Sequence, residues 1–158
     1  MPIVAAVDRS DRTESVVDQA RELADAYGVA LHVVHVGEAD VSRIPDTVNT
    51  GTVDETHGLG DLDRSDTPHE EVRQARDRAE RTAASIVEEI DGDDVVPVGL
   101  VGDPAPRLLD YASEVDAEYV VVSARKRSPV GKALFGSVTQ SLLLNADRPV
   151  VAVRVDPD

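Results

Sequence analysis

Residues 3–36, IVAAVDRSDRTESVVDQARELADAYGVALHVVHV, predict a strand, a helix and a second strand in succession. The first five residues of this stretch form an apolar run that stops at Asp8, which is typical of a strand buried on both faces. Between Val16 and Tyr27, apolar residues recur at spacings of three and four, so they lie on one face of a helix, and Gly28 is the predicted end of that helix. The final LHVVHV is a second buried strand, which makes the whole stretch one βαβ unit.

Helices and strands continue to alternate in the rest of the chain. The tetrapeptide TPHE is typical of a helix start, because Thr67 can cap the helix, Pro68 suits the first helical position and Glu70 is placed for a capping box. Apolar residues at helical spacing then continue to Ile90. Further strands are predicted at residues 95–101, 119–122 and 149–155, and further helices after a cap at Asp103 and over residues 137–146.

This alternation predicts an α/β fold with a doubly wound, Rossmann-like, five-stranded parallel sheet in a three-layer α/β/α arrangement. The 158 residues fit a single domain, 1–158, that buries roughly two-thirds of the surface of the unfolded chain. Residues 38–66 are rich in Asp, Gly, Thr and Ser and form a long polar insertion, which we expect to be partly mobile. The insertion is either a solvated spacer or a segment that touches the site or a protein partner.

The chain is strongly acidic. It has 31 acidic and 16 basic residues, a formal net charge of −15, and its two lysines are Lys126 and Lys132. Such an excess of carboxylates is typical of proteins kept soluble in concentrated salt, so we expect a halophilic, cytoplasmic protein. The same field repels nucleic acid and anionic membranes, which excludes both as partners for most of the surface. The absence of cysteine removes disulfides and thiolate chemistry, and no apolar stretch is long enough to span a bilayer.

Cations gather in the segment SARKRSPVGKALFGS, residues 123–137. Four cations lie in one stretch of eight residues inside this segment: Arg125, Lys126, Arg127 and Lys132. Lys126 is placed to meet a phosphate as a point charge, and Arg125 or Arg127 can grip one through two hydrogen bonds. The alternative is a loop whose cations pair with the carboxylates of the protein itself.

The same segment ends at a predicted helix start. Backbone N–H groups in the first turn of a helix lack helical partners and attract anions, so a phosphate fits at Gly136 and Ser137. Gly136 permits close approach of the main chain, and Ser137 can cap the helix or donate its hydroxyl to a phosphate oxygen. An ordinary capped helix start is the alternative. Asp8, Val36 and the loop from Ser123 all follow predicted strands, at the edge where open parallel sheets bind ligands.

No catalytic site assembles from these residues. Ser137 lacks the G-x-S-x-G elbow of the α/β-hydrolases, and the chain has no G-x-x-x-x-G-K-[ST] phosphate loop. His57 and His69 show no metal-ligand spacing. His32 and His35 are three apart on a strand and face opposite sides, and we expect His35 to bond to a backbone group. The sequence therefore predicts binding rather than catalysis, with at most slow and incidental ATP hydrolysis.

Four segments of the chain point to a known family: AVDRS (6–10), LHVVHV (31–36), VGDPAPRLLDYASEVDAEYVVVS (101–123) and GSVTQSLLLNADRPVVAV (136–153). Together they resemble the universal stress protein family, and the resemblance covers nearly the whole chain. It implies a doubly wound α/β fold and a homodimer formed through the last strand, residues 149–155. In one branch of the family it also implies ATP, with or without magnesium, or AMP in the crevice.

The nucleotide-binding branch has a glycine, two residues, a second glycine, nine residues, and then Gly followed by Ser or Thr. Aligned on Gly136 and Ser137, this chain has Ser123 and Lys126 where that branch has its two early glycines. Lys126 either blocks the site with its side chain or supplies an ammonium group in place of bare N–H groups.

The resemblance also implies roles for residues of the first two strands. Asp8 falls at an acidic position beside the adenosine, Val36 where main-chain groups meet adenine, and Val7 along the same pocket. Asp8 is equally explained as a cap or turn residue. The candidate binding residues are Val7, Asp8, Val36, Ser123, Arg125, Lys126, Arg127, Gly136, Ser137 and Val138.

Two functions follow from this reading. The first is a cytoplasmic, dimeric stress-response protein that binds an adenine nucleotide or another phosphorylated ligand in the crevice. The second is a dimeric module that binds no nucleotide and acts through a protein partner at residues 38–66. The two missing glycines favour this second function. An adenylating or ATP-hydrolysing enzyme is the weakest alternative, because DRSDR stands where a glycine-rich phosphate loop would follow the first strand.

Overall fold

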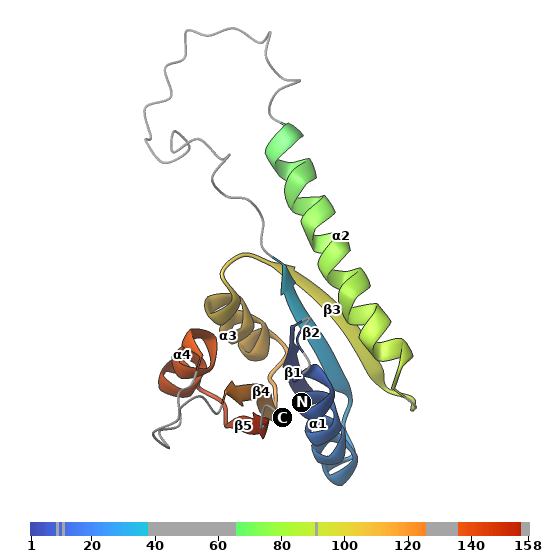
Figure 1. Cartoon of the computed structure of the whole chain (residues 1–158), viewed down its shortest axis with the longest axis vertical. Helices are drawn as coiled ribbons and strands as arrows, with labels where there is room; N and C mark the ends of the chain where they lie inside the picture. Colours follow the sequence, from blue (N-terminus) through green and yellow to red (C-terminus); the bar gives the residue numbers. More distant parts are fainter. Residues whose placement is uncertain (9, 11, 38–65, 91, 126–135, 156–158) are drawn as a thin grey trace, which may run out of the picture.

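A computed structural model of the chain describes residues 1–8, 10, 12–37, 66–90, 92–125 and 136–155. Strands and helices alternate along it, as Figure 1 shows. The predicted insertion, residues 38–66, lies outside the described residues, except for Asp66 at its end. The elements are β1 (Ile3–Val7), α1 (Thr13–Tyr27), β2 (Leu31–Gly37), α2 (Asp66–Glu88), β3 (Val95–Val101), α3 (Pro104–Glu114), β4 (Tyr119–Arg125), α4 (Ser137–Asn145) and β5 (Val150–Val155).

The five strands form one parallel sheet in the order β3-β2-β1-β4-β5. Along the chain, β2 and β3 follow on one side of β1, and β4 and β5 then follow on its other side. The strand order therefore switches between β1 and β4. This arrangement confirms the predicted doubly wound, five-stranded parallel sheet.

Two helices cover each face of the sheet. On one face, α1 and the C-terminal part of α2 pack over a core that includes Ile3, Ala5 and Val33. On the other face, α3 and α4 pack over a core that includes Val4 and Val34. Alternate residues of a strand point to opposite faces, so β1 and β2 must be apolar at nearly every position. The predicted three-layer arrangement is confirmed.

The βαβ unit at the start of the chain forms as predicted. The residue after α1 is Gly28, in the left-handed conformation with φ of 64°, and its N–H donates to the Asp25 carbonyl oxygen at 3.3 Å. Glycine adopts this conformation at the lowest cost, which is why the helix ends there. The cap at the other end of α1 is Arg12, whose side chain makes no capping hydrogen bond.

Small residues let α2 lie close against β2 and β3. Ala75 and Ala79 are buried on the side of α2 that faces the sheet. A Cβ atom placed on Gly37 of β2 would lie 3.2 Å from the Ala79 Cβ, and one on Gly99 of β3 would lie 2.3 Å from the backbone nitrogen of Glu80. The backbones of β3 and α2 therefore approach each other with no side chain between them at this point.

Several predicted element ends differ from the structure by a few residues. β4 continues to Arg125, beyond its predicted end, because its pairing with β5 runs on to that residue. α2 already includes Asp66, so Thr67 lies inside the helix and not at the predicted N-cap position. Asp103 does stand at the N-cap of α3, but its side chain makes no capping hydrogen bond.

Candidate functional site

The carboxyl ends of β1 and β4 separate at the point where the strand order switches. These strands pair only as far as Ala5 opposite Val121, although β1 runs to Val7 and β4 to Arg125. The helices that follow them diverge as well, because α1 covers one face of the sheet and α4 the other. Open parallel sheets bind their ligands at such a switch point.

Asp8 follows β1 directly, and local hydrogen bonds hold its carboxylate. Its Oδ1 accepts hydrogen bonds from the backbone N–H of Ser10, at 2.9 Å, and from the Ser10 hydroxyl, while its Oδ2 lies 3.5 Å from Nη2 of Arg12. The Thr13 hydroxyl donates to the Asp8 carbonyl oxygen at 2.5 Å. Partial burial acts to raise the pKa of Asp8, but the Ser10 hydrogen bonds and the charge of Arg12 outweigh it, and the pKa lies below its ordinary value. The structure thus supports the description of Asp8 as a turn residue.

The lowered pKa of Asp8 predicts a pH-dependent contribution to stability. Its contribution is present above the ordinary pKa of 3.8 and is lost as the pH falls through the lower pKa of the folded state. We expect Asp8→Asn to reduce the free energy of unfolding at neutral pH, by a small amount because the side chain is 54% exposed and solvent screens it.

Urea unfolding of both proteins at neutral pH and well below pH 3.8 measures this contribution. The difference between them should shrink at the acid pH. Asp18→Asn is the matched control, since Asp18 is exposed on α1 and has no hydrogen-bond or ion-pair partner among the described residues. A difference for Asp8→Asn that is the same at both pH values would contradict the prediction.

The first turn of α4 presents backbone N–H groups that have no partner in the helix. Gly136 is the N-cap, in an extended conformation with φ of −61° and ψ of 158°, and no side chain caps the helix. The first helical hydrogen bond runs from the N–H of Gln140 to the carbonyl oxygen of Gly136, at 2.9 Å. The N–H groups of Ser137, Val138 and Thr139 are therefore left over, at the positive end of the helix dipole. An anion is stabilised at such a position.

Contacts with β4 and the core hold this turn in place. The buried Thr139 hydroxyl donates to the carbonyl oxygen of Ser123 at 2.7 Å, and Leu142 in the next turn is fully buried. Ser123 lies inside β4, not at the start of a loop as predicted. Of the two roles suggested for Ser137, a helix cap or a hydroxyl donor to phosphate, the structure does not support the cap, because Ser137 is the first residue within α4 and Gly136 is the N-cap. A Cβ placed on Gly136 would meet no described atom within 4 Å, so the space beside it is open in the described part of the chain.

His35 ties the end of β2 to the end of β1. Its Nδ1 lies 3.0 Å from the carbonyl oxygen of Val7. A carbonyl oxygen only accepts hydrogen bonds, so Nδ1 carries the hydrogen. This confirms the prediction of a histidine bonded to the backbone. His32 faces the other side of the sheet, as its spacing predicts, and its Nδ1 lies 2.7 Å from the hydroxyl oxygen of Tyr111.

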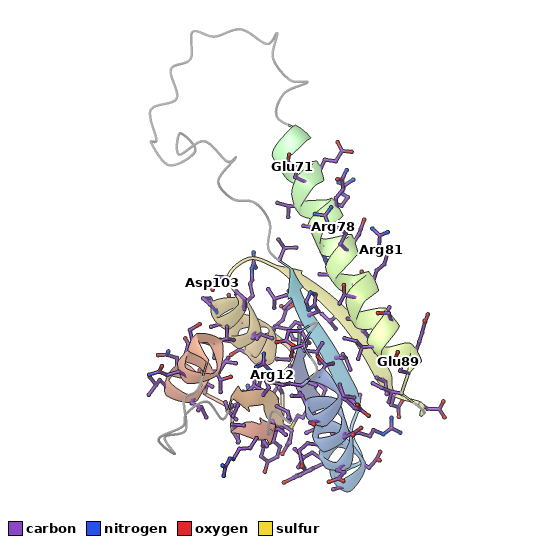
Figure 2. The ribbon with its side chains drawn as sticks, viewed as in Figure 1. Arg12, Glu71, Arg78, Arg81, Glu89 and Asp103 are labelled. Atoms are coloured by element: carbon purple, nitrogen blue, oxygen red, sulfur yellow. The ribbon has the colours of Figure 1, made fainter. Side chains whose placement is uncertain are left out.

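Within the described part of the chain, two hollows lie beside α2. The larger, about 680 Å³, lies between α1 and the C-terminal half of α2, and Asp8 and Ser10 are at its edge. The smaller, about 360 Å³, lies between the end of β2 and α2, where Val36 and Arg78 line it. Figure 2 shows Arg78 part-way along α2. Sequence reasoning missed Arg78, because it is one of four arginines in a helix that also carries acidic residues, and nothing local distinguishes it as a site residue.

The structure brings part of the predicted site together. Asp8 follows β1, Val36 lies near the end of β2, and the first turn of α4 is bound to β4, so these three groups share the carboxyl edge of the sheet. Val7 is 7% exposed and its side chain belongs to the core beneath α1. Val138 packs against the other core, which leaves its N–H as the group that a ligand can use.

The structure does not place the predicted cations. Arg125 is the last residue of β4, and Lys126 and Arg127 lie outside the described residues. Within the ranges that the structure does describe, no group of three or more His, Asp or Glu side chains could hold a metal ion. None of the helices in those ranges is both long and apolar enough to cross a membrane.

A sequence profile of the universal stress protein family matches residues 1–154. This chain belongs to the universal stress protein family. A universal stress protein from Archaeoglobus fulgidus has a similar structure, with a TM-score of 0.59 and 33% identity over 97% of this chain and 98% of that chain. The structure of the universal stress protein from Archaeoglobus fulgidus in complex with dAMP gives a TM-score of 0.55 and 30% identity, covering 97% of each chain.

A shorter match is more similar in sequence. A universal stress protein from Mycolicibacterium smegmatis is 48% identical to this chain over 58 residues, which are 37% of this chain and 43% of that protein. The family match confirms the resemblance drawn from the four sequence segments. It covers all the described elements except the last residue of β5, so the universal stress protein fold extends over both halves of the sheet.

Proposed function

We propose that this universal stress protein binds an adenine nucleotide, with its phosphates at the first turn of α4. The observation that carries the proposal is the set of three N–H groups, from Ser137 to Thr139, that have no helical partner. They lie beside Gly136, where an added Cβ would meet no described atom within 4 Å. Phosphates bind at helix N-termini of this kind. The Archaeoglobus fulgidus relative in complex with dAMP, at 30% identity, supports an adenine nucleotide as the ligand.

In this proposal the two ends of the ligand meet different parts of the carboxyl edge. Asp8 and the main chain at Val36 meet the ribose and the base, and Val7 supports them from the core. Ser123, Arg125, Lys126 and Arg127, with the residues of the α4 start, meet the phosphates. The ligand is ATP, with or without magnesium, or AMP. Binding, not catalysis, is the proposed activity.

We further propose that the protein is a single-domain, cytoplasmic homodimer from a halophilic source, joined through β5. This strand is the last in the order of the described sheet, so one of its edges pairs with no described strand. An unpaired strand edge favours pairing with another chain. The charge of −15 supports a cytoplasm rich in salt.

The dimer is tested by measuring molar mass. Light scattering across a range of protein and salt concentrations should give twice the 16.9 kDa of one chain. Because the surface is strongly acidic, the dimer should dissociate more readily at low salt, where repulsion between the two chains is less screened. A mass of one chain at every concentration would exclude the dimer.

A second function is favoured by the way Asp8 and Ser123 are already engaged. The Asp8 carboxylate is held by Ser10 and Arg12, and the Ser123 carbonyl oxygen accepts the Thr139 hydroxyl. In this alternative, the protein binds no nucleotide and acts as a dimeric interaction module, with residues 38–66 contacting a protein partner.

Calorimetric titration of ATP and magnesium into nucleotide-free protein in molar salt separates the two functions. Binding in the micromolar range or tighter is expected for the first function.

The variant Ser137→Pro then tests the α4 start, because proline removes one N–H that the helix does not use. The ψ of Gly136, 158°, is the conformation that a residue before proline favours, so the fold should tolerate the change.

We expect Ser137→Pro to weaken ATP binding about tenfold, as for the loss of one charge-assisted hydrogen bond, with an unchanged melting temperature. Ser137→Ala is the matched control, since it removes the hydroxyl and keeps the N–H. Equal affinity of the wild type and the proline variant would place the phosphates elsewhere. The absence of any binding by the wild type would favour the interaction module.

A further inference from the structure

Tyr27 and Tyr119 meet at the surface, at the end of the sheet opposite the proposed ligand site. Tyr27 is the last residue of α1 and Tyr119 is the first residue of β4. Their hydroxyl oxygens are 2.9 Å apart, and their ring centroids are 5.4 Å apart with an interplanar angle of 57°. The oxygens are closer than the ring centres, so the rings meet at the edges that carry the hydroxyl groups. Tyr27 is 48% exposed, which opens the pair to solvent.

The composition of the chain directs oxidation toward its tyrosines. The chain has no cysteine, no tryptophan and one methionine, and cysteine and methionine are the side chains that oxidants commonly consume first. Of the three tyrosines, Tyr111 is half-buried and its hydroxyl is bonded to His32. Tyr119 is half-buried as well, and its hydroxyl contacts that of the exposed Tyr27. An oxidant that removes one electron at a time therefore finds the exposed phenol, Tyr27, already in contact with a second phenol.

We propose that Tyr27 and Tyr119 form an oxidative modification site, at which a haem peroxidase acting with hydrogen peroxide joins the two rings covalently. Each phenol loses its hydroxyl hydrogen as one proton and one electron. The two phenoxyl radicals form one carbon–carbon bond between ring positions next to the oxygens. The hydrogens on these two carbons then move to the oxygens and restore both hydroxyl groups. The two protons and two electrons released reduce one hydrogen peroxide to two waters.

The geometry favours a link within one chain. The hydrogen bond between the two hydroxyl groups holds the two phenols together in the folded chain. The ring edges that must react are already adjacent, and the two elements that carry them are fixed by the cores on which they pack. The residues are 92 positions apart, so the link would fasten α1 to β4 and close a long loop. Closing a long loop restricts the unfolded chain, and a higher melting temperature should follow.

The test treats dilute folded protein with peroxidase and hydrogen peroxide and examines the monomer fraction. The expected product has lost two hydrogen atoms in its intact mass and shows dityrosine fluorescence. Its digest should contain one cross-linked species that joins the peptides of Tyr27 and Tyr119. Tyr27→Phe and Tyr119→Phe should each abolish this species, and Tyr111→Phe should leave it unchanged. These variants keep their rings, and circular dichroism checks that they fold.

Wild-type protein treated in urea is the control for proximity, because unfolding separates the pair. Loss of the Tyr27–Tyr119 species in urea, together with its presence in folded protein, supports the proposal. A folded monomer that stays unlinked, that is linked through Tyr111, or that is linked only to other chains would overturn it. The readout involves no nucleotide, so its result is independent of the proposed ligand.

Discussion

Replacing Gly99 with alanine is expected to lower the free energy of unfolding by about 3 kcal/mol, at the upper end of the usual cost of overpacking. The added methyl carbon would lie 2.3 Å from the backbone nitrogen of Glu80 and 2.7 Å from the carbonyl oxygen of Arg76. Both atoms belong to the backbone of α2, so no side-chain rotation can relieve the overlap. The helix must move away from β3, and the buried contacts of Ala79 and its neighbours loosen with it. Urea unfolding of the two proteins measures the difference.

Two further glycines are matched controls for this substitution. At Gly37 the added carbon would lie 3.2 Å from the Cβ of Ala79, so Gly37→Ala should cost about 1 kcal/mol. At Gly136 it would meet no described atom and φ is −61°, so Gly136→Ala should stay within about 0.5 kcal/mol of the wild type. Similar losses for all three variants would show that close approach of α2 and β3 is not the cause.

Replacing Leu142 with alanine is expected to cost about 3 kcal/mol, within the usual range for removing a buried leucine. Leu142 is fully buried in the core shared by α3, α4 and the sheet, and its removal leaves a cavity there. It also fixes the turn of α4 that follows Thr139, so its loss should loosen the helix start that we propose as the phosphate site.

Leu144 provides the comparison on the same helix. It is 74% exposed, so Leu144→Ala should change the free energy of unfolding by less than about 0.5 kcal/mol. Thermal and urea unfolding of both variants test the pair. A loss at Leu142 no larger than that at Leu144 would contradict the burial that the structure assigns to Leu142.

Much of the fold could be predicted from local patterns. The apolar run from Ile3 to Val7 predicted a strand buried on both faces, because such a strand is apolar at every position. Gly28 marked the end of α1, because the left-handed conformation needed there suits glycine. The end of β4 was harder, since Ser123 and Arg125 read as a polar loop. They extend the strand because β5 supplies backbone hydrogen-bond partners alongside them.

The candidate site could be predicted only in outline. The positions of Asp8 and Val36 after apolar runs placed them at the carboxyl edge of the sheet. The bonds that hold Asp8 in a turn, and the absence of a side-chain cap at Ser137, depend on backbone geometry that residue types do not specify. Arg78 reaches the end of β2 from a helix that begins beyond the insertion, and no spacing in the chain relates the two.

Local periodicity, composition and motifs were enough to predict the class of fold, the order of strands and helices, the excess of acidic residues and the family. The contacts between residues of distant segments became visible only in the tertiary structure. It placed Gly99 against Glu80, Thr139 against Ser123, and Tyr27 against Tyr119. Such contacts follow from the order of the strands and from the face that each helix covers, and these arise from packing the whole chain around two cores at once.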